Sequence, residues 1–116
     1  MSNVLIKNVQ IVNEGKITVS DILIGNQRIL KIEQGIGNKY NAREINGENK
    51  YLLPGVIDDQ VHFREPGLTH KANIHSESMA AVAGGTTSFM EMPNTKPPAL
   101  TQELLEEKYA IAANNA

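Results

Sequence analysis

Four polar side chains that could bind a metal or an anion occupy alternate positions near the middle of the chain. They are Asp58, Gln60, His62 and Arg64. Alternate residues of a β-strand share one face, so we expect these side chains to point one way and Ile57, Val61 and Phe63 to pack on the other face. Asp59 interrupts this polar and apolar alternation.

The chemistry that this face could perform is metal-dependent hydrolysis. Two imidazoles at positions i and i+2 of a strand can bind one metal ion, which lowers the pKa of a bound water to about 7. Here His62 is one such imidazole, but Gln60, whose neutral amide oxygen is a poorer zinc ligand, stands two residues earlier. A single histidine is more often a hydrogen-bonded structural residue, so the spacing alone leaves both roles open. His70 and His75 do not share a helical face, and we expect both to be solvated.

Anion binding is the second possibility, and it involves two loops. Arg64 follows the predicted strand, and a guanidinium can hold a carboxylate with two parallel hydrogen bonds. A surface salt bridge with Glu65 is the simpler alternative. Asn94 follows a proline, where asparagine usually serves in a turn. If the two loops follow neighbouring strands, Arg64 and Asn94 would lie close enough to share one small anion.

Alternating strands and helices are predicted to position these residues. The expected elements are a strand over 54–62, a helix over 73–83 capped by Asn73 and ended by Gly84-Gly85, a strand over 86–92, and a helix capped by Thr101. The second helix has an inner stripe with one polar exception, formed by Leu104, Leu105, Lys108, Tyr109, Ile111 and Ala112. This order predicts a parallel sheet, whose ligands bind in the loops at the carboxyl ends of the strands. Those loops are 62–72 and 93–100.

The N-terminal part, 3–53, is predicted to be a scaffold of short strands. Strands are expected at 4–6, 10–12, 16–24, 28–33 and 43–45, with turns at 13–15 and 25–26. Asn46-Gly47 is the strongest two-residue hairpin signal in the chain. The spacing indicates a small antiparallel sheet or half of a sandwich.

Composition narrows the classes of function. The net charge is −2 with scattered basic residues, and aromatic residues make up only 4%, so the sequence offers no nucleic-acid-binding surface. No apolar run is long enough to span a membrane, and the N-terminus lacks the pattern of a secretory signal. The chain has no cysteine, which excludes disulfides and thiolate metal sites and fits a cytoplasmic location.

Several segments together resemble a known family. They are Leu53-Pro54-Gly55-Val56-Ile57-Asp58, His62-Phe63-Arg64-Glu65-Pro66-Gly67, Ala83-Gly84-Gly85-Thr86-Thr87 and Met92-Pro93-Asn94-Thr95. The chain resembles the dihydroorotases, metal-dependent cyclic amidohydrolases of the amidohydrolase superfamily. Allantoinase-like sequences tend to carry asparagine at the position of Arg64, and hydantoinase-like sequences lack both loops in this form.

The resemblance implies a fold and a set of site residues. The implied fold is α/β: a β-sandwich segment over 1–53, then the first two βα units of a (β/α)8 barrel over 54–116. His62 would be the second histidine of a metal-binding His-x-His motif, with Gln60 at the first position. Arg64 and Asn94 would hold the substrate carboxylate, and Asp58 would support the metal ligands. A complete barrel needs about 250 residues, so we expect the N-terminal part of a longer enzyme, without catalytic residues of its own and inactive alone.

The resemblance also implies a reaction, the reversible hydrolysis of dihydroorotate to N-carbamoyl-aspartate in pyrimidine biosynthesis. The expected cofactor is zinc, the expected partner is this small-molecule substrate, and the expected assembly is a homo-oligomer, because open strand edges favour association. Two alternatives stay open. One is a non-catalytic homologue that acts as a structural or regulatory partner, as Gln60 indicates. The other is an allantoinase- or hydantoinase-like cyclic amidase.

Overall fold

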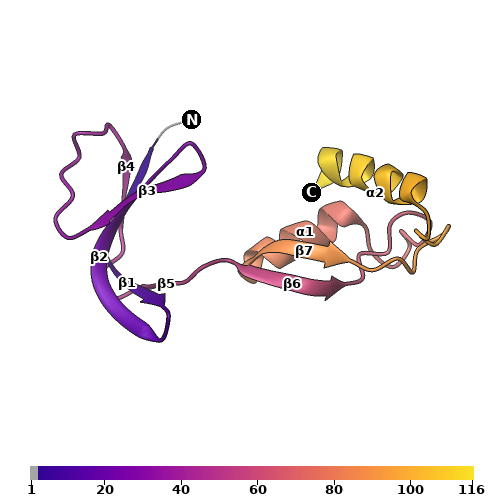
Figure 1. Ribbon diagram of the computed structural model, residues 1–116, viewed down its shortest axis with the longest axis horizontal. Helices are drawn as coiled ribbons and strands as arrows, with labels where there is room; N and C mark the ends of the chain where they lie inside the picture. The colour runs from indigo at the N-terminus through magenta and orange to yellow at the C-terminus, as the bar shows by residue number, and fades with distance from the viewer. Residues whose placement is uncertain (1–2) are drawn as a thin grey trace. The chain divides into compact units, whose positions relative to one another are not determined.

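The computed structural model describes residues 3–116, which form two compact units (Figure 1). The first unit ends at Pro54, and the second is Gly55–Ala116. The first contains β1 (Val4–Asn13), β2 (Lys16–Gly25), β3 (Arg28–Glu33), β4 (Arg43–Asn46) and β5 (Tyr51–Leu52). The second contains β6 (Val56–Val61), α1 (Ile74–Ala83), β7 (Thr86–Glu91) and α2 (Gln102–Asn115).

The sheet of the first unit is organised around β1. Its strand order is β3-β2-β1-β4, and β5 also pairs with β1. β1 and β3 run antiparallel to β2, whereas β4 and β5 run parallel to β1. The prediction of an antiparallel sheet is therefore wrong for the last two strands, and the sheet is mixed. The two short strands predicted at 4–6 and 10–12 are one strand, whose register shifts between Ile6 and Val9.

Two-residue turns connect the antiparallel strands. Glu14-Gly15 joins β1 to β2, and Asn26-Gln27 joins β2 to β3. All four residues have positive φ angles, as the hairpin turn that matches the twist of the strands requires. The hairpin predicted at Asn46-Gly47 is wrong, because β4 and β5 both pair with β1 and not with each other. The Gly47 N–H instead donates to the Lys7 carbonyl at 2.7 Å, which ties this turn to β1.

A buried carboxylate supports the register shift in β1. Asp21 on β2 is 1% exposed, and its two oxygens accept hydrogen bonds from the Asn8 and Ile36 N–H groups, both at 2.8 Å. Asn8 lies within the irregular part of β1 and has a φ of 56°. Ile36 packs with Leu5 in the core of this unit. Asp21 therefore satisfies backbone groups of two separate segments.

The second unit has the order and the pairing predicted for two βα units. β6 and β7 form a parallel pair, and Figure 1 shows their arrows side by side and pointing the same way. Asn73 caps α1 by accepting from the Ser76 N–H at 2.8 Å, and Thr101 caps α2 by accepting from the Leu104 N–H at 3.3 Å. Gly85 (φ 94°) provides the left-handed residue after α1. These predicted helix ends are confirmed.

The core of the second unit lies between the sheet and both helices. Val61, Phe63 and Ile74 are buried there, and the Phe63 and Phe89 rings pack with centroids 4.5 Å apart. The predicted packing of Val61 and Phe63 is confirmed. Ile57, which the same alternation places beside them, is 66% exposed, so that part of the prediction is wrong.

The inner stripe of α2 also differs from the prediction. Tyr109 and Leu105 are 63% and 45% exposed, whereas the polar member, Lys108, is buried as its place in the stripe predicts. Ile111 and Ala112 do pack against the core. Neither helix of the described part of the chain is long and apolar enough to cross a membrane.

Candidate functional site at the carboxyl ends of β6 and β7

A bulge interrupts β6 where the polar residues begin. From Asp58 to Val61 the strand advances three residues, while its partner β7 advances two, from Phe89 to Glu91. The extra residue breaks the rule that alternate side chains share a face. The shared face predicted for Asp58, Gln60, His62 and Arg64 therefore cannot follow from strand alternation. The Asp58 carboxylate accepts from the Gln60 N–H at 3.1 Å and so stabilises this bulge, while Gln60 itself is exposed.

His62 and Asn94 meet at the carboxyl ends of the two strands. The Nδ1 atom of His62 lies 2.9 Å from the Oδ1 atom of Asn94. An amide oxygen can only accept a hydrogen bond, so Nδ1 carries the hydrogen, and in the neutral imidazole Nε2 keeps its lone pair. A histidine that donates through one ring nitrogen is oriented to bind a metal through the other. From the sequence, His62 was predicted to bind a metal and Asn94 to bind an anion. In the structure the two side chains contact each other.

Arg64 lies beyond β6 in a left-handed conformation, with a φ of 70°. Its carbonyl accepts from the Leu68 N–H at 3.1 Å, so the backbone turns here instead of extending. Within residues 3–116 the Arg64 side chain is in no ion pair. The alternative salt bridge with Glu65 is wrong, because the Glu65 carboxylate accepts from the Ile74 N–H at 2.9 Å at the start of α1. Anion binding by Arg64 and Asn94 stays a prediction.

The loops that carry Arg64 and Asn94 contact each other directly. The Lys96 N–H donates to the Pro66 carbonyl at 3.1 Å. Beside this bond, Gly67 has a φ of 81°, and a Cβ atom at Gly67 would collide with the Lys96 carbonyl oxygen. The Met92 N–H donates to the Val61 carbonyl at 2.9 Å just before the loops. A glycine is therefore required where the two loops pack together.

Replacing Gly67 by alanine should destabilise the second unit by about 2–3 kcal/mol, because the left-handed backbone costs about 1–2 kcal/mol and the collision adds to it. Gly85→Ala is the matched control, since Gly85 also has a positive φ but would place its Cβ in open space. Chemical denaturation of both variants measures the difference. Equal losses of unfolding free energy would show that the loops do not pack as described.

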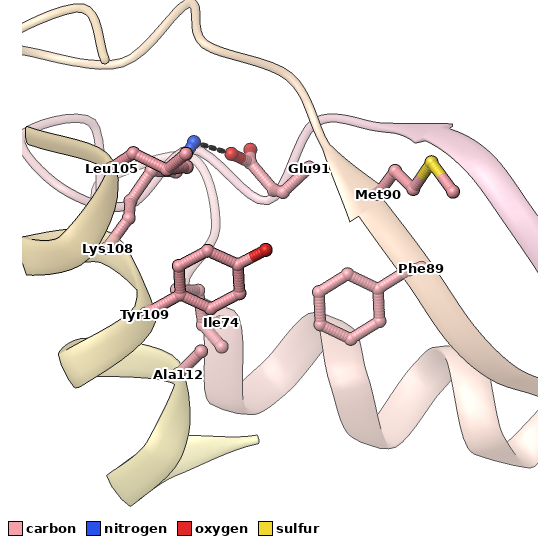
Figure 2. Close-up of a pocket in the computed structure, with 8 residues that line it drawn as sticks. All are labelled: Ile74, Phe89, Met90, Glu91, Leu105, Lys108, Tyr109 and Ala112. Atoms are coloured by element: carbon pink, nitrogen blue, oxygen red, sulfur yellow. Dashed lines mark ion pairs between the residues drawn. The ribbon is translucent and has the colours of Figure 1, made fainter. Parts of the chain in front are cut away.

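A buried ion pair lies under the two strand ends, and the sequence did not predict it. Glu91, the last residue of β7, pairs with Lys108 of α2, and their side chains are 9% and 7% exposed (Figure 2). Glu91 Oε1 accepts from the Phe63 N–H at 2.9 Å, and Lys108 Nζ donates to the Met92 carbonyl at 2.8 Å. Burial lowers the pKa of the Lys108 amine, while the carboxylate beside it favours the charged form. The only signal in the sequence was the cation within the apolar stripe of α2.

The pocket of Figure 2 lies between α2, β7 and the start of α1, with a volume of about 310 Å³. Glu91 and Lys108 are its charged groups, and the remaining lining is formed by Ile74, Phe89, Met90, Leu105, Tyr109 and Ala112. His62, Arg64 and Asn94 do not line it. The pocket is therefore separate from the loops to which the sequence assigns the chemistry.

The two remaining histidines are His70 and His75. Both side chains are exposed, as predicted. The Nδ1 atom of His75 lies 2.9 Å from the Asn115 carbonyl oxygen, so His75 joins the start of α1 to the end of α2. This contact gives His75 a structural role.

The side chains at this site meet only part of what a metal ion needs. His62 fits as one ligand, because its bond to Asn94 uses Nδ1 and leaves Nε2 available. Residues 3–116 contain no group of three or more His, Cys, Asp or Glu side chains placed to hold a metal ion. A zinc site in a hydrolase needs three protein ligands and an open position. The described residues therefore do not form a complete metal site.

Comparison with known proteins gives a consistent result. The family model described as "Dihydro-orotase-like" matches residues 49–115. A protein named dihydroorotase from Carboxydothermus hydrogenoformans is 50% identical over 91 residues, which are 78% of this chain and 21% of that protein. Another, from Ligilactobacillus salivarius, is 41% identical over 105 residues, 89% of this chain and 24% of that protein. The chain thus spans about a quarter of the length of these curated relatives.

Solved structures share the fold. The L-hydantoinase (dihydropyrimidinase) from Arthrobacter aurescens matches with a TM-score of 0.89 and 32% identity, over 97% of this chain and 25% of that one. A D-hydantoinase structure matches with a TM-score of 0.83 and 29% identity, over 98% of this chain and 25% of that one. The predicted fold class, a β-rich N-terminal part followed by two βα units, is confirmed.

Proposed function

The chain belongs to the dihydro-orotase-like family, and from this premise we propose that the protein is a dihydroorotase. The proposed reaction is the reversible hydrolysis of the cyclic amide of dihydroorotate to N-carbamoyl-aspartate. The observation that carries the proposal is 50% identity over 91 residues to a protein named dihydroorotase.

Arg64 and Asn94 are proposed to bind the substrate carboxylate. They lie on two loops that hydrogen-bond to each other, which holds a guanidinium and an amide at neighbouring strand ends. Because the Asn94 oxygen accepts from His62, its Nδ2 group still has hydrogens to donate to an anion. Arg64 has no competing carboxylate among residues 3–116. Both features fit the recognition of an acidic cyclic amide.

Zinc is the proposed cofactor, with His62 as one of its ligands. Zinc in hydrolases lowers the pKa of water and polarises carbonyl groups. Gln60 is proposed as a second, weaker donor, and Asp58 as the residue that shapes the backbone at Gln60. The cytoplasmic location, the role in pyrimidine biosynthesis and the homo-oligomeric assembly stay predictions.

A hydantoinase-like activity is the second candidate, since the matched structures include hydantoinases. Their identities of 32% and 29% are below the 50% and 41% of the two dihydroorotases, which favours the first candidate. A non-catalytic homologue is the third, and its motive is Gln60 in place of a histidine.

A substrate panel tests the proposal. The full-length protein, purified with zinc, should hydrolyse dihydroorotate and leave hydantoin and allantoin unchanged. Turnover of hydantoin in place of dihydroorotate would favour the second candidate. A zinc-free protein without turnover of any of the three would favour the third.

Replacing Gln60 by histidine should increase zinc affinity, because imidazole is a better zinc ligand than an amide oxygen. We expect about a tenfold decrease in the zinc Kd, which corresponds to about 1.4 kcal/mol of binding free energy. Competition with a chromogenic chelator measures this Kd. Asp59→His is the control, because it adds an exposed imidazole at the neighbouring position of the same bulge. Equal Kd changes in both variants would contradict a site at Gln60.

A further inference from the structure

The Phe63 N–H lies in the backbone between the proposed metal ligand His62 and the proposed carboxylate ligand Arg64. Its hydrogen-bond acceptor is Oε1 of Glu91, at 2.9 Å. β6 has already ended at Val61, so no ladder bond fixes this part of the backbone. A side chain from the neighbouring strand fixes it instead.

The Glu91 carboxylate is itself held in place. Its second oxygen pairs with the Lys108 ammonium, and that ammonium also donates to the Met92 carbonyl, at 2.8 Å. Met92 lies just before the loop that carries Asn94. One buried pair therefore contacts the backbone at both strand ends, and it connects these ends to α2.

Stability alone does not account for two charges in this position. Removing a pair of ions from water costs several kcal/mol per ion, roughly, and apolar residues of similar volume are often as stabilising or more so. The adjoining pocket is mostly apolar, so apolar residues in place of the pair would fit their surroundings. What apolar residues could not supply is an acceptor for the Phe63 N–H and a donor for the Met92 carbonyl.

We propose that Glu91, held by Lys108, is a positioning residue that fixes the backbone between His62 and Arg64 relative to the loop of Asn94. Both side chains are largely buried. The pair acts through the Phe63 amide and keeps the His62 imidazole in contact with Asn94. That these loops bind substrate rests on the proposed function. That Glu91 fixes the backbone at Phe63 does not.

Two double variants separate positioning from stability. Glu91→Leu with Lys108→Met removes both charges and the acceptor. Glu91→Gln with Lys108→Met removes the same charges but keeps an amide oxygen for the Phe63 N–H. Both variants lose the bond from Lys108 to Met92, and only the glutamine variant has an acceptor for the Phe63 N–H, together with a side-chain NH2 group. Urea denaturation of each identifies any change in stability.

The readouts are the tautomer of His62 and the hydrogen exchange of the Phe63 amide. The full-length protein, freed of metal by a chelator, is labelled with 15N-histidine at a pH where imidazole is neutral, and the signals lost in His62→Gln are assigned to His62. We expect the native protein and the glutamine variant to show His62 protonated at Nδ1. The leucine variant should lose this signature, and its Phe63 amide should exchange about tenfold faster, or more, as expected for a lost charge-assisted hydrogen bond.

Three results would overturn the proposal. The first is a leucine variant that keeps the Nδ1 signature, and the second is loss of the signature in both variants. The third needs no variant: a Phe63 amide of the native protein that exchanges at the rate of an unprotected amide. This last measurement decides the matter even if the leucine variant does not fold. None of these readouts involves turnover, so a native protein that fails to hydrolyse dihydroorotate refutes the proposed function and leaves this inference standing.

Discussion

Replacing Arg64 by alanine should lower kcat/KM for dihydroorotate by about 10²- to 10³-fold, while a neutral analogue without the carboxylate, dihydrouracil, is affected little. The expected loss follows from removing two charge-assisted hydrogen bonds, each contributing about 1.5–3 kcal/mol, with part of that loss recovered by water. Steady-state kinetics with both substrates measure the change in kcat/KM for each. The carboxylate is bound throughout the reaction, so most of the change should be in KM.

Two further variants at this position are matched controls. Arg64→Lys keeps the charge but loses the two-pronged geometry, and it should recover only part of the activity. Arg64→Asn removes the charge but tolerates the left-handed backbone of this position, so it should resemble Arg64→Ala. Equal losses with dihydroorotate and dihydrouracil would mean that Arg64 acts on the fold and not on the carboxylate.

Replacing Lys108 by methionine should destabilise the second unit by about 3–5 kcal/mol, because it leaves the Glu91 carboxylate buried without its counter-ion. Urea denaturation, followed by a signal from the second unit, measures this loss of unfolding free energy. Adding Glu91→Leu to this variant should restore most of the stability, because the uncompensated charge is then gone.

The exposed pair of Lys31 and Glu33 provides the control for this effect. Their side chains are 40% and 54% exposed, and surface pairs contribute little to stability. Lys31→Met should therefore leave the unfolding free energy nearly unchanged. A Lys108→Met variant that is equally stable would show that Glu91 finds another partner or takes up a proton.

The helix ends of the second unit were predictable because their signals are local. Asn73 and Thr101 each bond to an N–H three residues later, and Gly84-Gly85 follows α1 directly. Such contacts depend on a few neighbouring residues, which the sequence shows. The βα order followed from the same local signals.

The geometry of the candidate site was less predictable because it depends on pairing between distant segments. The bulge in β6 exists only in relation to β7, although Asp59 had marked the place where alternation fails. The contact between His62 and Asn94, 32 positions apart, likewise depends on which strands are neighbours. The predicted parallel pairing of the two strands indicated that their loops are neighbours, but it did not indicate which atoms are in contact.

At two places the local pattern did not show the pairing partner. Asn46-Gly47 is typical of a hairpin, but β1 offers its edge to both flanking strands, and this tertiary pairing overrides the turn preference. Lys108 was predicted as the one polar member of the inner stripe of α2, and it is buried there, but the stripe did not show its partner. Glu91, which makes its burial possible, lies on another element.

The parallel pairing of β1 also has a consequence for the order in which the first unit folds. β1, β2 and β3 are joined by two-residue turns, so their contacts close short loops, whereas Gln10 of β1 pairs with Tyr51 of β5. Closing a longer loop costs more entropy and slows the formation of such contacts. During refolding we expect amides of β2 to gain protection before the Gln10 N–H, which donates to the Lys50 carbonyl. On the ribosome the same chain would hold a three-stranded meander until residues 43–52 emerge and complete the sheet.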